Sequence, residues 1–165
     1  MGKKSIRENK NVYQVSREQL ELTREAASEQ MDFVSSDRIE KIESSKSLPH
    51  PDEILQMAKC YKSPYLCNYF CSHECPIGIR YVPEVHEKEL SQIVLEMLAS
   101  LNSMEKYKDR LIEITVDGEI SEDEWDDFSE IQANLKKISL SVNTLSMWLE
   151  KAVCDGVISE EHMRK

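Results

Sequence analysis

Apolar residues in the first 70 positions recur at helical spacing within short segments, and residues that start or stop helices separate these segments. We predict five helices there. The third shows the signals most plainly, because Ser35 can cap its start and Ile39 and Ile42, three residues apart, share one face. The expected helices cover about 11–22, 24–31, 36–43, 51–61 and 64–70. The apolar residues expected to face the core are Val12, Val15, Leu20, Ile39, Ile42, Ile54, Leu55, Ala58, Tyr61, Leu66, Tyr69 and Phe70.

From residue 86 onward the same spacing persists over much longer stretches. It predicts one helix over 86–116 and a second over 121–153, the latter about nine turns long at roughly 3.6 residues per turn. A helix of this length needs a partner along its apolar side. Gly118 and Gly156 are expected to end the two helices in the left-handed conformation. We therefore predict an all-α protein in which a five-helix domain is followed by a long helical hairpin.

Charge divides the chain into two parts of different character. Residues 1–70 carry 11 Lys and Arg against 11 Asp and Glu, whereas residues 71–165 carry 10 against 20 and so supply the whole net charge of −10. Phosphate would repel the second part but not necessarily the first. The predicted organisation is a basic N-terminal arm over 1–10, a helical domain over 11–75, a linker over 76–85 and an acidic helical hairpin over 86–165.

Composition excludes several classes of protein. No apolar run approaches the roughly 20 residues that cross a bilayer, and the first ten residues lack the apolar core of a signal peptide, so we expect a cytoplasmic protein with no membrane partner. The chain has no Gly-rich phosphate loop and no Ser, His and Asp in a catalytic order. We therefore expect no enzymatic activity.

One segment carries a family resemblance: "LTREAASEQMDFVSSDRIEKIESSKSLPHPDEILQMAKCY". Two short helices joined by a tight turn, the second entered through serine, match the geometry of a helix-turn-helix. Residues 11 to about 71 resemble the phage-repressor-like (XRE-type) helix-turn-helix family, and the whole chain resembles a Gram-positive subgroup with a Cys-rich "CPIG" junction and an acidic helical tail. The chain differs from the family pattern at two places. Its turn "MDFVSS" is one residue longer and lacks the usual glycine, and "ESSK" has serine where glycine is frequent.

The resemblance implies roles for particular residues of the third predicted helix and its surroundings. The residues that would face base edges are Ser36, Asp37 and Lys41. The residues that would contact the DNA backbone are Arg24, Ser35, Arg38 and Lys46. A structural ion pair is expected between Arg17 and Glu43. In the major groove, a carboxylate at position 37 could accept a hydrogen bond from the amino group of cytosine.

The function implied is a sequence-specific transcription regulator that binds double-stranded DNA and reads the major groove with the helix over 36–43, most simply as a dimeric repressor. A homodimer through residues 86–153 is expected, because the helix over 121–153 has more apolar surface than one helix over 86–116 can cover. The alternative is a protein–protein interaction module of a mobile-element regulatory system that does not bind DNA directly.

Two other groups of residues were considered as metal sites. Cys60, Cys67, Cys71 and Cys75 lie within sixteen residues and could hold zinc or an iron-sulfur cluster, although cysteine is often simply buried and packing is the favoured interpretation. The segment from Glu113 to Glu124 overlays a calcium loop but lacks aspartate at its first two ligand positions. A capping box between Ser121 and Glu124 explains the same residues.

Overall fold

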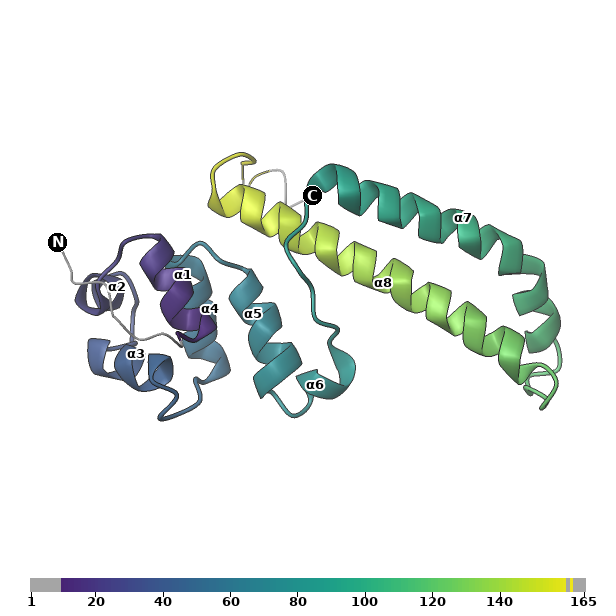
Figure 1. The fold of residues 1–165 in the computed structure, drawn as a ribbon, viewed down its shortest axis with the longest axis horizontal. Helices are drawn as coiled ribbons and strands as arrows, with labels where there is room; N and C mark the ends of the chain where they lie inside the picture. The colour runs from purple at the N-terminus through teal and green to yellow at the C-terminus, as the bar shows by residue number, and fades with distance from the viewer. Residues whose placement is uncertain (1–9, 160, 162–165) are drawn as a thin grey trace. The chain divides into compact units, whose positions relative to one another are not determined.

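The computed structural model describes residues 10–159 and residue 161, and within them the chain is all-α, without strands (Figure 1). The predicted fold class, all-α, is confirmed. In chain order the elements are α1 (Val12–Gln19), α2 (Arg24–Glu29), α3 (Ser36–Glu43), α4 (Pro51–Cys60), α5 (Tyr65–Tyr69), a π-helical turn η1 (Phe70–Glu74), α6 (Gly78–Tyr81), α7 (Leu90–Thr115) and α8 (Trp125–Cys154). Two compact units are formed. One contains the chain up to Val85 and the part from Leu149 onward, and the other contains His86–Trp148.

The last turns of α8 belong to the first unit, whereas the sequence placed residues 86–165 together in one hairpin. Lys151 Nζ donates a hydrogen bond to the carbonyl oxygen of Lys62 at 3.0 Å, and Ala152 is buried. These interactions attach the end of α8 to the residues that follow α4. The hairpin of the second unit therefore comprises α7 and the part of α8 before Leu149.

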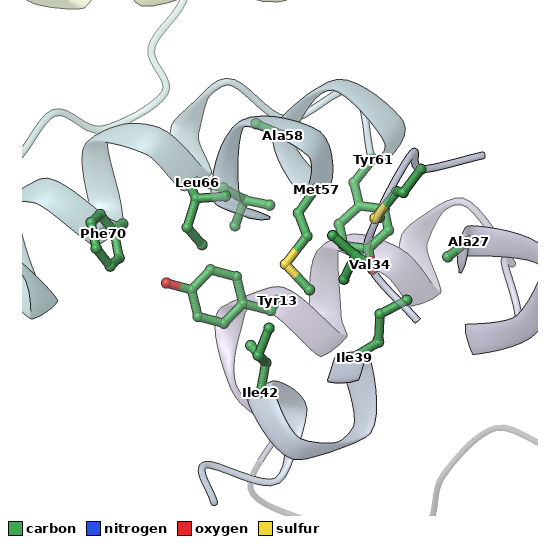
Figure 2. Close-up of a cluster of buried hydrophobic side chains, with 12 residues drawn as sticks. Tyr13, Ala27, Val34, Ile39, Ile42, Met57, Ala58, Tyr61, Leu66 and Phe70 are labelled. Carbon is green, nitrogen blue, oxygen red and sulfur yellow. The ribbon is translucent and has the colours of Figure 1, made fainter. Parts of the chain in front are cut away.

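Helices α1 to α5 and the turn η1 contribute side chains to the core of the first unit (Figure 2). Ile39 and Ile42 of α3 are 0% and 1% exposed, so α3 is anchored along one side. Figure 2 shows Tyr13 among Ile42, Met57 and Leu66, with its hydroxyl pointing toward η1. That hydroxyl donates a hydrogen bond to Glu74 Oε2 at 2.7 Å. The buried members of the core are Tyr13, Ala27, Met31, Val34, Ile39, Ile42, Ile54, Met57, Ala58, Tyr61, Leu66 and Phe70.

Val12 of α1 packs against the core as predicted, but the other two predicted core residues of this helix region do not. Val15 and Leu20 are 39% and 40% exposed, whereas Tyr13 and Arg17 are 2% and 6% exposed. Residues 13 and 17 lie one turn apart on the same side of the helix, away from Val15. The apolar pattern was misleading because the inward side carries an aromatic hydroxyl and a paired arginine instead of aliphatic residues.

Helix α4 shows a smaller difference of the same kind. The predicted Leu55 is 65% exposed, and Met57 is fully buried in its place. Ile54, Met57, Ala58 and Tyr61 are spaced three or four residues apart along one side, from which Leu55 is rotated away.

Side-chain caps fix where the first three helices begin. Asn11, Thr23 and Ser35 each accept a hydrogen bond from the backbone N–H three residues later. The cap at Ser35 confirms the predicted start of α3, which covers the predicted residues 36–43. The turn between α2 and α3 contains no residue with positive φ, so it does not require the glycine that the family usually has there.

Three helices end in the left-handed conformation without glycine. The residues concerned are Glu21, Ser45 and Lys62, with φ of 57°, 56° and 51°. After α3, Ser45 N donates to the carbonyl oxygen of Ile42 at 3.0 Å and Lys46 N donates to that of Lys41 at 2.9 Å, the bonds of a Schellman motif. The second serine of "ESSK" thus occupies the position where glycine would be least strained.

Close packing between η1 and α6 accounts for the glycine of the "CPIG" junction. A Cβ added to the buried Gly78 would lie 2.0 Å from the backbone carbonyl oxygen of Cys71. Beyond α6 the chain is extended and held by Asn68, whose Nδ2 donates to the carbonyl oxygen of Pro83 at 3.0 Å and whose Oδ1 accepts from Val85 N at 2.8 Å. The segment predicted as a linker is therefore attached to the first unit.

The second unit is a helical hairpin of α7 and the larger part of α8, which run antiparallel (Figure 1). Ser103 Oγ donates to Asn134 Oδ1 at 3.3 Å, and Arg110 Nε donates to Asp127 Oδ2 at 2.7 Å. At the hairpin tip, Gly118 has φ of 79° as predicted. No helix in the described residues is both long and apolar enough to span a membrane.

The predicted capping box at the tip forms only in part. Glu124 Oε2 accepts hydrogen bonds from the backbone N and the Oγ of Ser121, at 3.1 and 2.6 Å. The α-helix itself begins later than predicted, at Trp125. A turn over 122–124 stands between the capping serine and the helix.

Candidate nucleic-acid interface

The outward edge of α3 carries the residues that the sequence assigned to base contacts. Asp37 and Lys41 are exposed and Ser36 is half-exposed, whereas Ile39 and Ile42 on the opposite side are fully buried. Asp37 and Lys41 are one turn apart and lie on the same side of the helix. The structure therefore places Asp37 and Lys41 on one solvent-facing edge, whereas the half-exposed Ser36, three residues before the buried Ile39, lies at the margin of that edge.

A buried ion network holds the C-terminal end of α3. Glu43 accepts hydrogen bonds from Arg17 Nε at 2.6 Å and from Arg17 Nη2 at 2.9 Å, a bidentate arrangement between α3 and α1. Arg24 Nε of α2 donates to Glu43 Oε2 at 2.8 Å. The Glu43 side chain is 0% exposed, and Arg17 also donates to the carbonyl oxygen of Leu22. The expected ion pair between Arg17 and Glu43 is present, and it includes a third member.

The third member, Arg24, was expected to contact the DNA backbone. Its Nε is used by Glu43, and a third of its side chain remains exposed. The structure therefore gives Arg24 an internal partner that the sequence analysis missed. The signal was weak, because an arginine near the start of a helix is as compatible with phosphate as with a carboxylate on another helix.

Arg38 was also assigned to the DNA backbone, and the structure gives it partners within the domain. Its Nε and Nη2 donate to the two carboxylate oxygens of Glu53 at 2.6 and 2.7 Å. Nη1 donates to Ser47 Oγ, and Nη2 also donates to the carbonyl oxygen of Leu48 at 2.9 Å. All three guanidinium nitrogens thus bind within the domain. Arg38 joins α3 to the start of α4, and its contact with phosphate stays a prediction.

Glu53 is the partner that the sequence analysis did not find. It had been interpreted only as a carboxylate at the positive end of α4. Its Oε2 does accept from His50 N at 2.7 Å, as a helix-starting carboxylate does. The pKa of Glu53 is lowered, chiefly by the hydrogen bond from Arg38. Burial acts in the opposite direction and raises the pKa, and the hydrogen bond from His50 N lowers it further. This carboxylate is therefore charged at neutral pH and fixed in place.

The remaining backbone candidates differ in availability. Ser35 is exposed, but its Oγ accepts from Arg38 N as the cap of α3. Lys46 Nζ donates to Glu40 Oε1 at 3.1 Å in an exposed pair, which costs little to break. Lys41 has no ion pair with any other residue of the described chain. The outward side of α3 and the turn that follows it thus carry cations and carboxylates in equal number, from Lys41 and Lys46 and from Asp37 and Glu40.

The four clustered cysteines pack against the core of the first unit. All are free thiols and half-buried. Within the described residues, no three His, Cys, Asp or Glu lie close enough together to hold a metal ion. Burial raises the pKa of the thiols of Cys60, Cys67 and Cys71, which disfavours the thiolate that zinc or an iron-sulfur cluster requires. The contacts with the core are those of packed thiols, and metal binding at the junction stays a prediction.

Comparisons with known proteins add no assignment to this geometry. No protein-family model matches the chain, and no curated protein and no solved structure matches it either.

Proposed function

We propose that the chain is a DNA-binding transcription regulator whose first unit is a helix-turn-helix domain and whose α3 enters the major groove. The observation that supports this best is the pair of contrasting sides of α3. One side is locked to the domain by Ile39, Ile42 and the buried Glu43, and the other presents Asp37 and Lys41 to solvent, with Ser36 half-exposed at the start of the helix. A recognition helix needs such a rigid mount, because base readout depends on fixed side-chain positions.

The electrostatics predict selective rather than strong binding. Arg38 is held by Glu53 and Arg24 by Glu43, so two of the cations near α3 already have carboxylate partners. When few phosphates are contacted, the binding constant falls only gently as the salt concentration rises. A plot of the logarithm of the binding constant against the logarithm of the salt concentration has a slope of about −0.9 per phosphate contact. Lys41 is the cation most available to DNA on this edge. Such a regulator would act in the cytoplasm and, as a dimer, would bind two half-sites.

The same internal pairing of Arg24 and Arg38 favours a second candidate. A domain whose arginines are already neutralised can bind a protein partner through the outward edge of α3, without DNA. This is the interaction-module alternative. The two candidates differ in one measurable property, because only the first predicts binding to duplex DNA that weakens as salt increases.

The test begins with the full chain and a pool of random duplex DNA, from which bound sequences are recovered and sequenced. The enriched duplex is then titrated by fluorescence anisotropy at several salt concentrations. We expect an enriched inverted repeat, and we expect Lys41→Ala to weaken its binding by about 1–3 kcal/mol while relaxing the sequence preference. Lys59→Ala, an exposed lysine on α4, is the matched control and should bind as the unaltered chain does. Failure to enrich any sequence, together with no salt-dependent binding, would rule out the DNA proposal in favour of the interaction module.

A further inference from the structure

Helix α8 carries an apolar heptad repeat over most of its length. The positions alternate at spacings of three and four, as the a and d positions of a helical bundle do. They are Phe128, Ile131, Leu135, Ile138, Val142 and Leu145. Helix α7 has a matching row at spacings of four and three, interrupted once by Lys108. This row consists of Leu90, Val94, Met97, Leu101, Met104 and Leu111.

Much of this apolar surface is uncovered in the hairpin. On α7, Val94 is 41% and Leu101 is 47% exposed, and on α8, Leu135 is 45% and Val142 is 47% exposed. The hydrogen bonds that join the two helices come from other residues, such as the pair of Ser103 and Asn134. Ile131 is fully buried within the hairpin, so the packing of α7 against α8 explains only part of the heptad rows and leaves the exposed members without a partner in the hairpin.

Both rows lie on the same face of the hairpin. Successive residues of a helix are about 100° apart around its axis. On this basis the heptad row of each helix is displaced around the axis from the residues that hydrogen-bond to the other helix, and the displacement has the same sense in α7 and α8. Because the helices are antiparallel, rotation in the same sense brings both rows to one face. On the other side of the line of contact lies a shallow groove that includes Ala99, Lys137 and Leu140. The two heptad rows thus share one face of the hairpin, while Leu95 and Leu98 of α7 are exposed outside the rows.

We propose that a second copy of this chain covers the apolar face, with the two hairpins antiparallel in a four-helix bundle. The size of the face fits this partner. The 26 residues of α7 span about 39 Å at about 1.5 Å per residue, and two helices side by side, each about 10 Å wide, present about 800 Å². That is about the area per partner of a stable protein–protein interface.

Charge determines the orientation. The hairpin tip over residues 113–130 carries nine Asp and Glu and no Lys or Arg. Parallel hairpins would place two such tips together, and their repulsion would oppose association. In the antiparallel arrangement the tips are separated by about the length of α7, well beyond the screening distance of about 8 Å at physiological ionic strength.

Self-association is independent of DNA binding, and its test contains no DNA, so either proposal can fail without the other. The mass of the full chain in solution is measured by sedimentation equilibrium. We expect twice the 19.2 kDa of one chain. The double variant Leu135→Lys, Val142→Lys should become monomeric with unchanged helical circular dichroism, because both side chains are already half-exposed in the hairpin. The control Ser129→Lys, Ala133→Lys adds the same charge at exposed positions on the side of α8 away from Leu135 and Val142 and should remain dimeric.

Orientation is tested by carbodiimide cross-linking of the unaltered chain. Lys88 precedes α7 and lies far from the tip of its own hairpin. A bond from Lys88 to a carboxylate of residues 113–130 must therefore join two copies, and only antiparallel hairpins bring these positions together. A monomeric unaltered chain at its highest soluble concentration would overturn the proposal. A dimer that survives the lysine pair at 135 and 142 would overturn the assigned face, and absence of the Lys88 bond would overturn the antiparallel arrangement.

Discussion

The guanidinium of Arg38 and the carboxylate of Glu53 form two hydrogen bonds, at 2.6 and 2.7 Å, across the loop that joins α3 to α4. Because the same guanidinium also binds Ser47 Oγ and the carbonyl oxygen of Leu48, one side chain organises the whole connection. The position of α3 relative to α4, and so the direction of its outward edge, depends on this pair.

We expect Arg38→Gln to lower the free energy of unfolding by about 1–2 kcal/mol. Hydrogen bonds to charged groups contribute about 1.5–3 kcal/mol, and the lower figure allows for the partial exposure of Arg38. Urea unfolding followed by circular dichroism measures the change. Lys59→Gln on exposed α4 surface should change stability by less than about 0.5 kcal/mol. Unchanged stability of Arg38→Gln with a flatter salt dependence of DNA binding would instead return Arg38 to a phosphate contact.

The pair also predicts a pH dependence. The pKa of Glu53 is lower in the folded chain than its usual value of 4.5, chiefly because of the hydrogen bond from Arg38. The unfolded chain therefore takes up this proton at a higher pH, and the stabilisation is present above about 4.5 and lost as pH falls through the folded pKa. We expect the stability difference between the unaltered chain and Glu53→Gln to be constant near neutral pH and to shrink below about pH 4.5. A difference that grows on acidification would contradict this assignment.

Glu43 offers a sharper test of the buried network. In Glu43→Ala, Arg17 and Arg24 lose their shared carboxylate, and the buried Arg17 keeps only the carbonyl oxygen of Leu22 and the more distant carboxylate of Glu18, at 3.9 Å. Removing one partner from a buried ion pair costs about 3–5 kcal/mol, and the partial exposure of Arg24 places the expected loss near the lower end of that range. The matched control is Glu40→Ala on the same helix, whose exposed pair with Lys46 should contribute less than about 1 kcal/mol. Equal losses in the two variants would mean that the network does not stabilise the domain.

Local signals predicted α3 well. Its bounds follow from the Ser35 cap and from the spacing of Ile39 and Ile42, all within nine residues, and the structure has the same bounds. The partner of Arg38 could not be predicted in this way. Glu53 lies 15 residues away, and only the folded connection between α3 and α4 brings it within hydrogen-bonding distance.

The inward side of α1 was missed for a related reason. Apolar periodicity identifies the aliphatic side of a helix, but α1 buries Tyr13 and Arg17, whose polar ends have partners on other elements. Those partners, Glu74 and Glu43, are 61 and 26 residues away. A pattern confined to eight residues of sequence contains no information about them.

Ser45 provides a prediction of increased stability. At φ of 56°, a side chain with a Cβ is strained by about 1–2 kcal/mol, whereas glycine adopts this conformation freely. Glycine also loses more entropy on folding, by about 0.5–1 kcal/mol, so we expect Ser45→Gly to gain about 0.5–1 kcal/mol. Thermal unfolding measures the gain. Ser45→Ala keeps the Cβ and should show no gain, and a gain of equal size in both variants would exclude backbone strain as the cause.

Gly78 should tolerate no side chain, for a reason unrelated to its φ. A Cβ there would lie 2.0 Å from the carbonyl oxygen of Cys71 and 2.9 Å from its Cα, and these backbone atoms cannot move aside without displacing η1. We expect Gly78→Ala to destabilise the first unit by about 1–3 kcal/mol, the usual cost of overpacking, with faster amide hydrogen exchange across α6 and η1. Ile77→Ala, next to it and 72% exposed, is the control and should leave both quantities nearly unchanged. If Gly78→Ala exchanged at the unaltered rate, the close approach of α6 to η1 would be wrong, and the "CPIG" glycine would need another explanation.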